Sequence, residues 1–186
     1  MPKVNAAVTI ENVVASVTLN QKIDLNAVLK AYPGVDYRPQ QFPGFVFRLR
    51  KPKTATLIFS SGRMVCTGAK SEREAKTAVL KIARELKNGG IVITGKPETR
   101  IVNIVASVNL WGMIDLEKAA YKLGKTMYEP EQFPGLIHRT DDPKTVILIF
   151  RSGKLVCTGA TKEEDVNRAV EKLHGKLEEE QLIYYE

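Results

Sequence analysis

The sequence has little cysteine and no long hydrophobic run. Two cysteines in 186 residues allow one disulfide at most. The longest unbroken apolar run, residues 146–150, is far shorter than the roughly 20 residues that a membrane-spanning helix needs. The first residues have neither an apolar signal core nor a small-residue cleavage site. We therefore expect a protein that stays inside the cell and keeps both cysteines as buried thiols.

Motifs for metal ions and for nucleophilic catalysis are also missing. No Cys-x-x-Cys, His-Glu-x-x-His or calcium-loop spacing occurs, so we predict no metal and no cofactor. His138 and His174 are each unique to their part of the chain, and neither is near a cysteine in sequence. Alternation along their predicted strands places the side chains of Cys66 and Cys157 on the side that faces the helix–sheet core, where each is expected to be a small buried hydrophobic residue. We predict that the protein is not an enzyme.

Charge is unevenly distributed along the chain. The formal net charge is +7, and a division at Thr94 gives about +9 for the first part and about −2 for the second. This imbalance suits a first half that faces a polyanion and a second half that also meets a protein partner. Charge alone leaves open the alternative of a merely soluble basic surface.

An internal repeat determines the predicted architecture. A shift of 91 residues aligns residues 10–86 with residues 101–177 without a gap, and about 35 of roughly 77 positions are identical. Matching blocks include Gln41–Gly44 with Gln132–Gly135 and Val65–Ala69 with Val156–Ala160. Two copies are too few for a solenoid, so we expect a pseudo-twofold molecule whose halves, residues 1–94 and 95–186, share one sheet.

Each copy is predicted to contain the same series of elements. An alternating β-rich segment is followed by a short helix that starts at Asp24, or at Asp115 in the second copy. A Phe-Pro-Gly loop and three strands come next, at residues 45–50, 55–60 and 64–69. A capping box at residues 71–74 then starts a long helix whose apolar residues recur at helical spacing.

The same alternation predicts a sheet face that no helix covers. Residues 13, 15, 17 and 19 can face the helices, which places residues 12, 14 and 16 on the opposite side. That opposite face collects apolar side chains from the later strands, and basic residues surround it. An open apolar floor with a cationic rim suits a widened DNA minor groove, whose floor offers few donors and whose walls are phosphate.

At these residues the sequence resembles the TATA-box-binding proteins of the archaeal type. The duplicated blocks, the stretch Tyr128–Gly135 and the run Leu57–Ala69 are similar to that family's motifs, and the resemblance extends from about Val8 to Leu177. It implies an α+β fold, a saddle with a curved ten-stranded antiparallel sheet and four helices on its convex face. It also implies a general transcription initiation factor that binds the TATA box in the minor groove and bends the DNA.

The resemblance assigns roles to individual residues. The DNA-intercalating residues are Phe42, Phe59, Phe133 and Phe150. The minor-groove floor is contacted by Asn12, Val14, Val46, Leu57, Val65, Thr67, Asn103, Val105, Ile137, Leu148, Val156 and Thr158. Phosphates are contacted by Arg48, Ser61, Arg63, Arg139, Ser152 and Lys154. Ordinary core packing, strand propensity or solvated charge is the alternative explanation for these residue types.

The resemblance also implies partners. Glu129, Glu131 and Gln132 correspond to the surface that engages transcription factor B, and the DNA complex would nucleate assembly with RNA polymerase. The protein is expected in the cytoplasm of an archaeal cell, associated with the nucleoid, as a monomer on DNA, with dimerisation of the free protein left open. Two alternatives are a nucleic-acid-holding module of a nuclease or repair enzyme and a scaffold whose concave face docks another protein.

Overall fold

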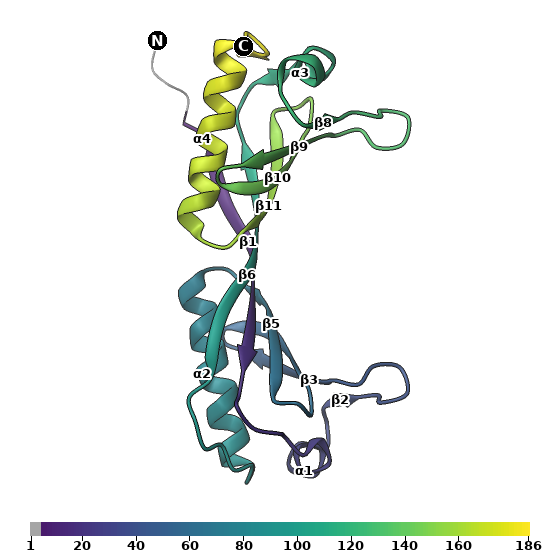
Figure 1. Cartoon of the computed structure of the whole chain (residues 1–186), viewed down its shortest axis with the longest axis vertical. Coiled ribbons are helices and arrows are strands. Elements are labelled where there is room, and N and C mark those ends of the chain that lie inside the picture. Colours follow the sequence, from purple (N-terminus) through teal and green to yellow (C-terminus); the bar gives the residue numbers. More distant parts are fainter. Residues whose placement is uncertain (1–4) are drawn as a thin grey trace. The chain divides into compact units, whose positions relative to one another are not determined.

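The computed structural model describes residues 5–186, and within this range it contains four helices and a ten-stranded antiparallel sheet (Figure 1). The hydrogen-bonded order of the strands is β2-β3-β4-β5-β1-β6-β11-β10-β9-β8. A separate two-stranded ribbon joins β7 to β12. The predicted α+β class, the ten antiparallel strands and the four helices are confirmed.

The chain forms two compact units, which we call the first unit and the second unit. The first unit is Asn12–Val102, and the second unit consists of residues 5–11 with Asn103–Glu186. The strands β1 (Ala7–Thr18) and β6 (Glu98–Asn109) each contribute a part to both units. A division of the chain into repeats 1–94 and 95–186 stays a prediction from the sequence.

The remaining elements follow the same order in both units. The first unit contains α1 (Leu25–Ala31), β2 (Asp36–Tyr37), β3 (Phe45–Arg50), β4 (Lys53–Ile58), β5 (Arg63–Ala69) and α2 (Glu72–Asn88). The second unit contains β7 (Met113–Ile114), α3 (Leu116–Lys122), β8 (Thr126–Met127), β9 (Leu136–Asp141), β10 (Lys144–Ile149), β11 (Lys154–Ala160), α4 (Glu163–Glu179) and β12 (Ile183–Tyr184).

The predicted helix starts agree with the structure. The Asp24 carboxylate accepts the N–H of Asn26 at 3.0 Å, and the Asp115 carboxylate accepts the N–H of Lys118 at 3.1 Å. Ser71 caps α2 by accepting the N–H of Glu74 at 2.9 Å. These bonds satisfy backbone donors that have no partner inside the first turn of a helix.

Each unit packs one face of its sheet against its long helix. Alternate residues of β1, including Val13, Ala15 and Val17, are completely buried, as predicted. The helix side is supplied by the predicted stripes, whose members are Ala75, Ala78, Val79, Ile82, Ala83 and Leu86 in α2, and Val166, Ala169, Val170, Leu173 and Leu177 in α4. Complete burial of one such aliphatic side chain stabilises a fold by about 1.5–3 kcal/mol.

Several local features differ from the sequence prediction. The strand β4 begins two residues before its predicted start because the turn after β3 uses only residues 51 and 52. The two-residue strands β2 and β8, and the ribbon of β7 with β12, did not emerge from the alternation pattern because two residues carry no period. Within residues 5–186, no helix is both long and apolar enough to cross a membrane.

Candidate nucleic-acid interface

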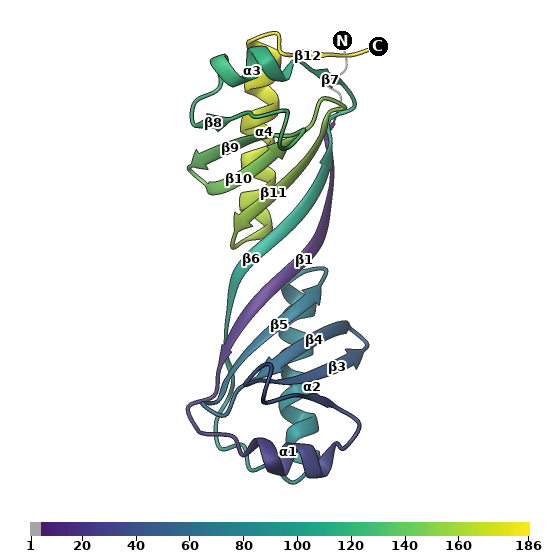
Figure 2. The ribbon, with the colours of Figure 1, turned by 90° about the vertical axis from the view of Figure 1, so that its right-hand side faces the viewer.

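The sheet face opposite the long helix is not covered within either unit. Figure 2 looks onto this face, with α2 and α4 behind their sheets. Every residue predicted for the minor-groove floor is only partly buried, whereas most of its strand neighbours on the helix side, such as Val13, Cys66 and Ile147, are completely buried. The fold therefore leaves these apolar side chains accessible, which argues against their assignment as ordinary core residues.

The strand register places the floor residues in rows. In the first unit, Val46 lies opposite Leu57, Leu57 opposite Val65, and Val65 opposite Ser16. The second unit repeats this row with Ile137, Leu148, Val156 and Ser107. Directly opposed residues of antiparallel strands project from the same face, so each row is an apolar strip three strands wide that ends at a serine on the fourth strand.

Each unit brings together a pair of phenylalanines that are 17 positions apart in the sequence. The ring centroids of Phe42 and Phe59 are 5.6 Å apart with planes at 65°, and those of Phe133 and Phe150 are 5.8 Å apart at 71°. Such edge-to-face contacts hold two rings in a defined mutual orientation. Phe42 and Phe133 remain 37% and 38% exposed, so each pair presents aromatic surface to solvent.

Glycines form the platform on which the phenylalanine pairs rest. A Cβ at Gly44 would lie 2.6 Å from Cε1 of Phe42 and 3.0 Å from Cε1 of Phe59. At Gly135 the equivalent distances are 2.8 Å to Phe133 and 3.0 Å to Phe150. The repeated Phe-Pro-Gly sequence is explained by this contact, because any side chain at the glycine would push the two rings away.

The two floor asparagines are oriented by the backbone of β5 and β11. Oδ1 of Asn12 accepts the N–H of Gly68 at 2.8 Å, and Oδ1 of Asn103 accepts the N–H of Gly159 at 2.7 Å. A backbone donor requires the amide oxygen on that side, which places Nδ2, with its two N–H donors, at the other end of each side chain. Asn12 Nδ2 also donates to Oγ1 of Thr67 at 3.2 Å. Each asparagine is thus a preorganised hydrogen-bond donor.

Irregular strand pairing leaves the N–H groups of Gly68 and Gly159 able to bond with the two asparagine side chains. The register between β1 and β5 shifts between Val13 and Ala15, and that between β11 and β6 shifts between Cys157 and Ala160. Gly68 has φ +97° at the first irregularity, a conformation that residues with a Cβ rarely adopt. A bulge re-aims backbone groups locally. Sequence reasoning missed the role of this glycine, although its recurrence 91 residues later was a usable signal.

The predicted phosphate contacts are exposed on the same strands and on the hairpin turns that join them. Arg48 and Arg139 follow the apolar rows on β3 and β9, and they lie opposite Ala55 and Val146. Arg63 and Lys154 begin β5 and β11, directly after the hairpin turns that hold Ser61 and Ser152. In each turn the serine hydroxyl accepts a backbone N–H at 3.4 Å. Each apolar strip is therefore bounded by cations.

The predicted protein-binding residues Glu129, Glu131 and Gln132 are exposed in the loop between β8 and β9. The carbonyl oxygen of Glu129 accepts the N–H groups of Gln132 and Phe133, each at 3.0 Å, so the loop is folded into a turn that also contains Phe133. In the loop of the first unit, the carbonyl oxygen of Arg38 accepts the equivalent N–H groups of Gln41 and Phe42. Arg38 and Gln40 stand where the second unit has carboxylates. Only the second loop is acidic.

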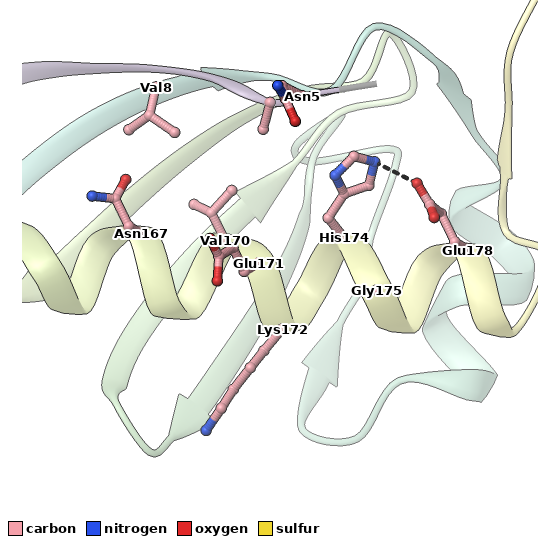
Figure 3. A pocket seen from close by; sticks show the side chains of 10 residues that line it. Asn5, Val8, Asn167, Val170, Glu171, Lys172, His174, Gly175 and Glu178 are labelled. Carbon is pink, nitrogen blue, oxygen red and sulfur yellow. Dashed lines mark ion pairs between the residues drawn. The ribbon is translucent and has the colours of Figure 1, made fainter. Parts of the chain in front are cut away.

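A cavity of about 720 Å³ lies elsewhere (Figure 3). Its wall is formed by one side of α4 and by the start of the chain near Val8. Glu171 and Glu178 contribute carboxylates, and the latter lies 3.0 Å from Nε2 of His174. This helix-side cavity does not include the phenylalanine pair or the floor residues, and its carboxylates disfavour a polyanion.

The cysteines lie behind the open face. Cys66 and Cys157 are fully buried free thiols on the helix side of β5 and β11, where burial raises the pKa of both. His138 lies on the helix side of β9, since it lines a cavity with Ala169 and Leu173 of α4, and burial lowers its pKa. Among residues 5–186, no cluster of three or more His, Cys, Asp or Glu side chains is arranged to hold a metal ion.

Comparisons with known proteins agree with this geometry. The family model described as transcription factor TFIID, or TATA-binding protein, matches residues 7–89 and 98–180. The TATA-box-binding protein of Sulfurisphaera tokodaii is 56% identical over 174 residues, which cover 94% of this chain and 88% of the relative. The TATA-box-binding protein of Aeropyrum pernix is 52% identical over 176 residues, covering 95% of this chain and 87% of the relative. A solved structure described as Methanococcus jannaschii TBP superposes with a TM-score of 0.83 at 48% identity, covering 92% of this chain and 98% of that one.

Proposed function

The chain belongs to the TATA-binding protein family of transcription factors, and we propose that it is a general transcription initiation factor that binds the TATA box of promoters in the DNA minor groove. The observation that carries this proposal is the uncovered apolar strip of each unit, flanked by an exposed phenylalanine pair and by cations. A flattened minor groove matches all three features, because its floor is poor in donors and its walls are phosphate.

In this proposal the phenylalanine pairs bend the DNA. Phe42 with Phe59, and Phe133 with Phe150, enter base steps as wedges and unstack them. Unstacking costs about a few kcal/mol per step, and the bend that results lets more protein surface contact the duplex. Edge-to-face packing over a glycine keeps each pair rigid, so little side-chain entropy is lost on insertion.

Selection of the TATA box follows from the free donors and from DNA deformability. The Nδ2 groups of Asn12 and Asn103 donate to adenine N3 and thymine O2, which are the acceptors of the A·T minor groove. A G·C pair places its own amino donor in that groove, opposite these donors. Pyrimidine–purine steps such as TA are also easily kinked, which favours the same sequences.

Competition binding tests this function. The wild-type protein is incubated with a labelled TATA duplex and competed with unlabelled TATA or G·C-rich duplexes of equal length at one fixed salt concentration. We expect the TATA competitor to be at least about a hundredfold more effective, since specific binding exceeds nonspecific binding by about 10³ or more. Equal competition would contradict the proposal and favour a nucleic-acid-holding module without sequence preference.

Salt dependence separates the phosphate contacts from the base contacts. Arg48, Arg63, Arg139 and Lys154 would neutralise four phosphates, which corresponds to a slope of about −3.6 in log K against log salt. Replacement of Arg139 with Gln is expected to reduce that slope by about one while the preference for TATA is kept.

We also propose that the acidic loop of the second unit recruits transcription factor B and, through it, RNA polymerase. Two observations support this proposal. Glu129 and Glu131 are exposed, and the first unit has a basic and a neutral residue at the same positions. The variant Glu129→Arg with Glu131→Gln, which copies Arg38 and Gln40, is expected to bind the TATA duplex normally and to lose the ternary complex with transcription factor B. A ternary complex of unchanged affinity would refute this assignment.

A further inference from the structure

Trp111 occupies an unfavourable position between β6 and β7 of the second unit. Its backbone has φ +62°, in the left-handed region that bulky residues rarely adopt, and its side chain is 58% exposed. The N–H of Trp111 donates to Oδ1 of Asn109 at 2.9 Å, which fixes this conformation. Neither backbone strain nor exposure of an indole stabilises the free protein, so the residue is a candidate for function.

The ribbon of β7 with β12, which begins two residues after Trp111, adds two exposed apolar side chains. Met113 lies directly opposite Tyr184 in the antiparallel pairing, so both project from one face, and they are 45% and 49% exposed. The other face of the ribbon is formed by Ile114 and Ile183, which are buried. We call Trp111, Met113 and Tyr184 the ribbon patch.

Tight packing holds the end of the chain against the ribbon patch. A Cβ at Gly112 would lie 2.8 Å from Cγ1 of Ile183 and 2.9 Å from Cδ1 of Tyr185. The hydroxyl of Tyr185 donates to Oε1 of Glu178 at 2.7 Å, and it lies 2.6 Å from Nε2 of His174. The ribbon patch is therefore built on an ordered segment that is anchored to α4.

A cavity of about 270 Å³ adjoins the ribbon patch. Met113 and Tyr184 form part of its lining, together with the aromatic ring of Tyr128 and the side chains of Asp115, Glu117 and Arg151. A space of this size accepts one aliphatic side chain, and central apolar anchors that fill such pockets dominate the binding energy of many protein interfaces.

The first unit shows that the fold does not require the ribbon patch. In the repeat alignment, Trp111 corresponds to Asn20 and Met113 to Lys22, both of which are exposed. Asparagine is among the residues that best tolerate left-handed backbone, so a less strained choice exists for position 111 as well. The equivalent turn of the first unit thus has a polar surface, and in the part of the chain that the structure describes both the ribbon and its apolar side chains are specific to the second unit.

Charge around the ribbon patch indicates the chemistry of its partner. Residues 178–186 contain four glutamates, Glu178, Glu179, Glu180 and Glu186, and no lysine or arginine. Asp115 and Glu117 add carboxylates at the cavity, where Arg151 is the lining cation. Lys118 pairs with Asp115, and Lys122 and Lys176 pair with Glu180. The attraction for a cation therefore rests mainly on Glu117, Glu179 and Glu186. Carboxylates attract cationic groups, and exposed faces of tryptophan and tyrosine bind guanidinium and ammonium groups through cation–π contacts. Nucleic acid is disfavoured here for the same reason.

We propose that the ribbon patch is a docking site for a cationic protein segment in which arginine or lysine flanks an aliphatic anchor. The anchor enters the cavity beside Met113, and the flanking cations contact Trp111, Tyr184 and the surrounding carboxylates. This site is separate from the open sheet face, so DNA and the cationic segment bind at the same time.

The single tryptophan of the chain provides a direct assay. Trp111 emission is recorded while a heptapeptide of alternating arginine and leucine, which has no aromatic residue, is added at low salt. We expect a saturable change in emission with half-saturation at about 100 µM or below. A heptapeptide of alternating glutamate and leucine should give no change. Absence of a response to the arginine peptide would overturn the proposal.

Two variants give the test its specificity. Met113→Lys copies Lys22 of the first unit, so it should fold, and it is expected to weaken the peptide at least tenfold. Leu80→Lys changes an exposed apolar residue of α2 and should leave peptide binding unchanged. Both variants should bind a TATA duplex like wild type, which separates this proposal from the DNA-binding function.

Three results would contradict the inference. Equal peptide affinity of wild type and Met113→Lys would show that the peptide binds elsewhere. A Trp111 response to duplex DNA alone that Met113→Lys abolishes would assign the ribbon patch to nucleic acid. A response that depends on protein concentration in the absence of peptide, and that Met113→Lys removes, would assign it to a second copy of the chain.

Discussion

Replacement of Asn12 with Asp separates DNA recognition from stability. The bond from the Gly68 N–H to Oδ1 needs an acceptor, and a carboxylate supplies one. The position of Nδ2, which is a donor in the wild type, becomes an acceptor with negative charge. We therefore expect Asn12→Asp to fold with an unchanged or slightly raised melting temperature and to bind TATA DNA poorly.

The structure gives the size of the effect. Loss of one hydrogen bond to adenine N3 or thymine O2 costs about 1–3 kcal/mol of discrimination, which corresponds to a reduction of affinity by about 5- to 150-fold. Repulsion between the new carboxylate and the phosphates adds to this loss at low salt. Asn12→Ala instead leaves the Gly68 N–H without its acceptor, so it should also lower the free energy of unfolding by about 1 kcal/mol.

The assay compares three proteins by fluorescence anisotropy on a TATA duplex and by thermal unfolding. Asn26→Asp is the matched control, because it makes the same chemical change on an exposed residue of α1. Wild-type affinity of Asn12→Asp would show that Nδ2 does not face the DNA. Unfolding of Asn12→Asp would show that the role assigned to Oδ1 is wrong.

Three further predictions concern the glycine platform, a buried thiol and a helix cap. Gly135→Ala should displace the rings of Phe133 and Phe150, because the new Cβ would lie 2.8 and 3.0 Å from them. The variant should therefore unstack 2-aminopurine less when this base is placed at the end of the TATA site. An unchanged 2-aminopurine fluorescence would refute the platform role of the glycine. Burial raises the pKa of Cys157 from 9.0 to about 11, so at pH 8 its alkylation in the folded protein should be at least about a hundredfold slower than in urea. Equal alkylation rates in the folded and the urea-unfolded protein would contradict this expectation. The same pKa shift should lower the free energy of unfolding as pH rises from 9 through 11, because the thiol of the unfolded chain loses its proton first. Lys162 stands at the N-cap of α4 and makes no side-chain hydrogen bond there, whereas Ser71 caps α2 with its hydroxyl. Lys162→Ser should therefore raise the melting temperature by about 2–4 °C. An unchanged melting temperature would contradict the capping argument.

Much of the fold could be predicted because its signals are periodic. The alternation that buries Val13 and Val17 while leaving Val14 accessible is a direct consequence of strand geometry, and the apolar stripe of α2 has the helical period. The gapless repetition at 91 residues doubled each signal. The elements that were missed, β2, β8 and the ribbon of β7 with β12, depend on tertiary packing of two residues each.

The sequence proposed candidate site residues, but it could not predict how the fold positions them. Alternation and resemblance identified Asn12 and Phe42, yet neither could show that Gly68 orients the amide or that Gly44 supports the ring. Both depend on contacts between residues far apart in sequence, for which one chain carries no periodic signal. Trp111 was also missed, because its left-handed backbone is visible only in the structure.

Energy transfer between dyes at the two ends of a TATA duplex tests the central claim most directly, because it reports whether the open faces bend the DNA they bind. Saturating wild-type protein should bring the ends closer, and the variant Phe59→Ala with Phe150→Ala should bind more weakly and leave the duplex nearly straight, with little change in melting temperature because these rings lie outside the core. A straight duplex under saturating wild type, or collapse of the fold in the double variant, would contradict the account.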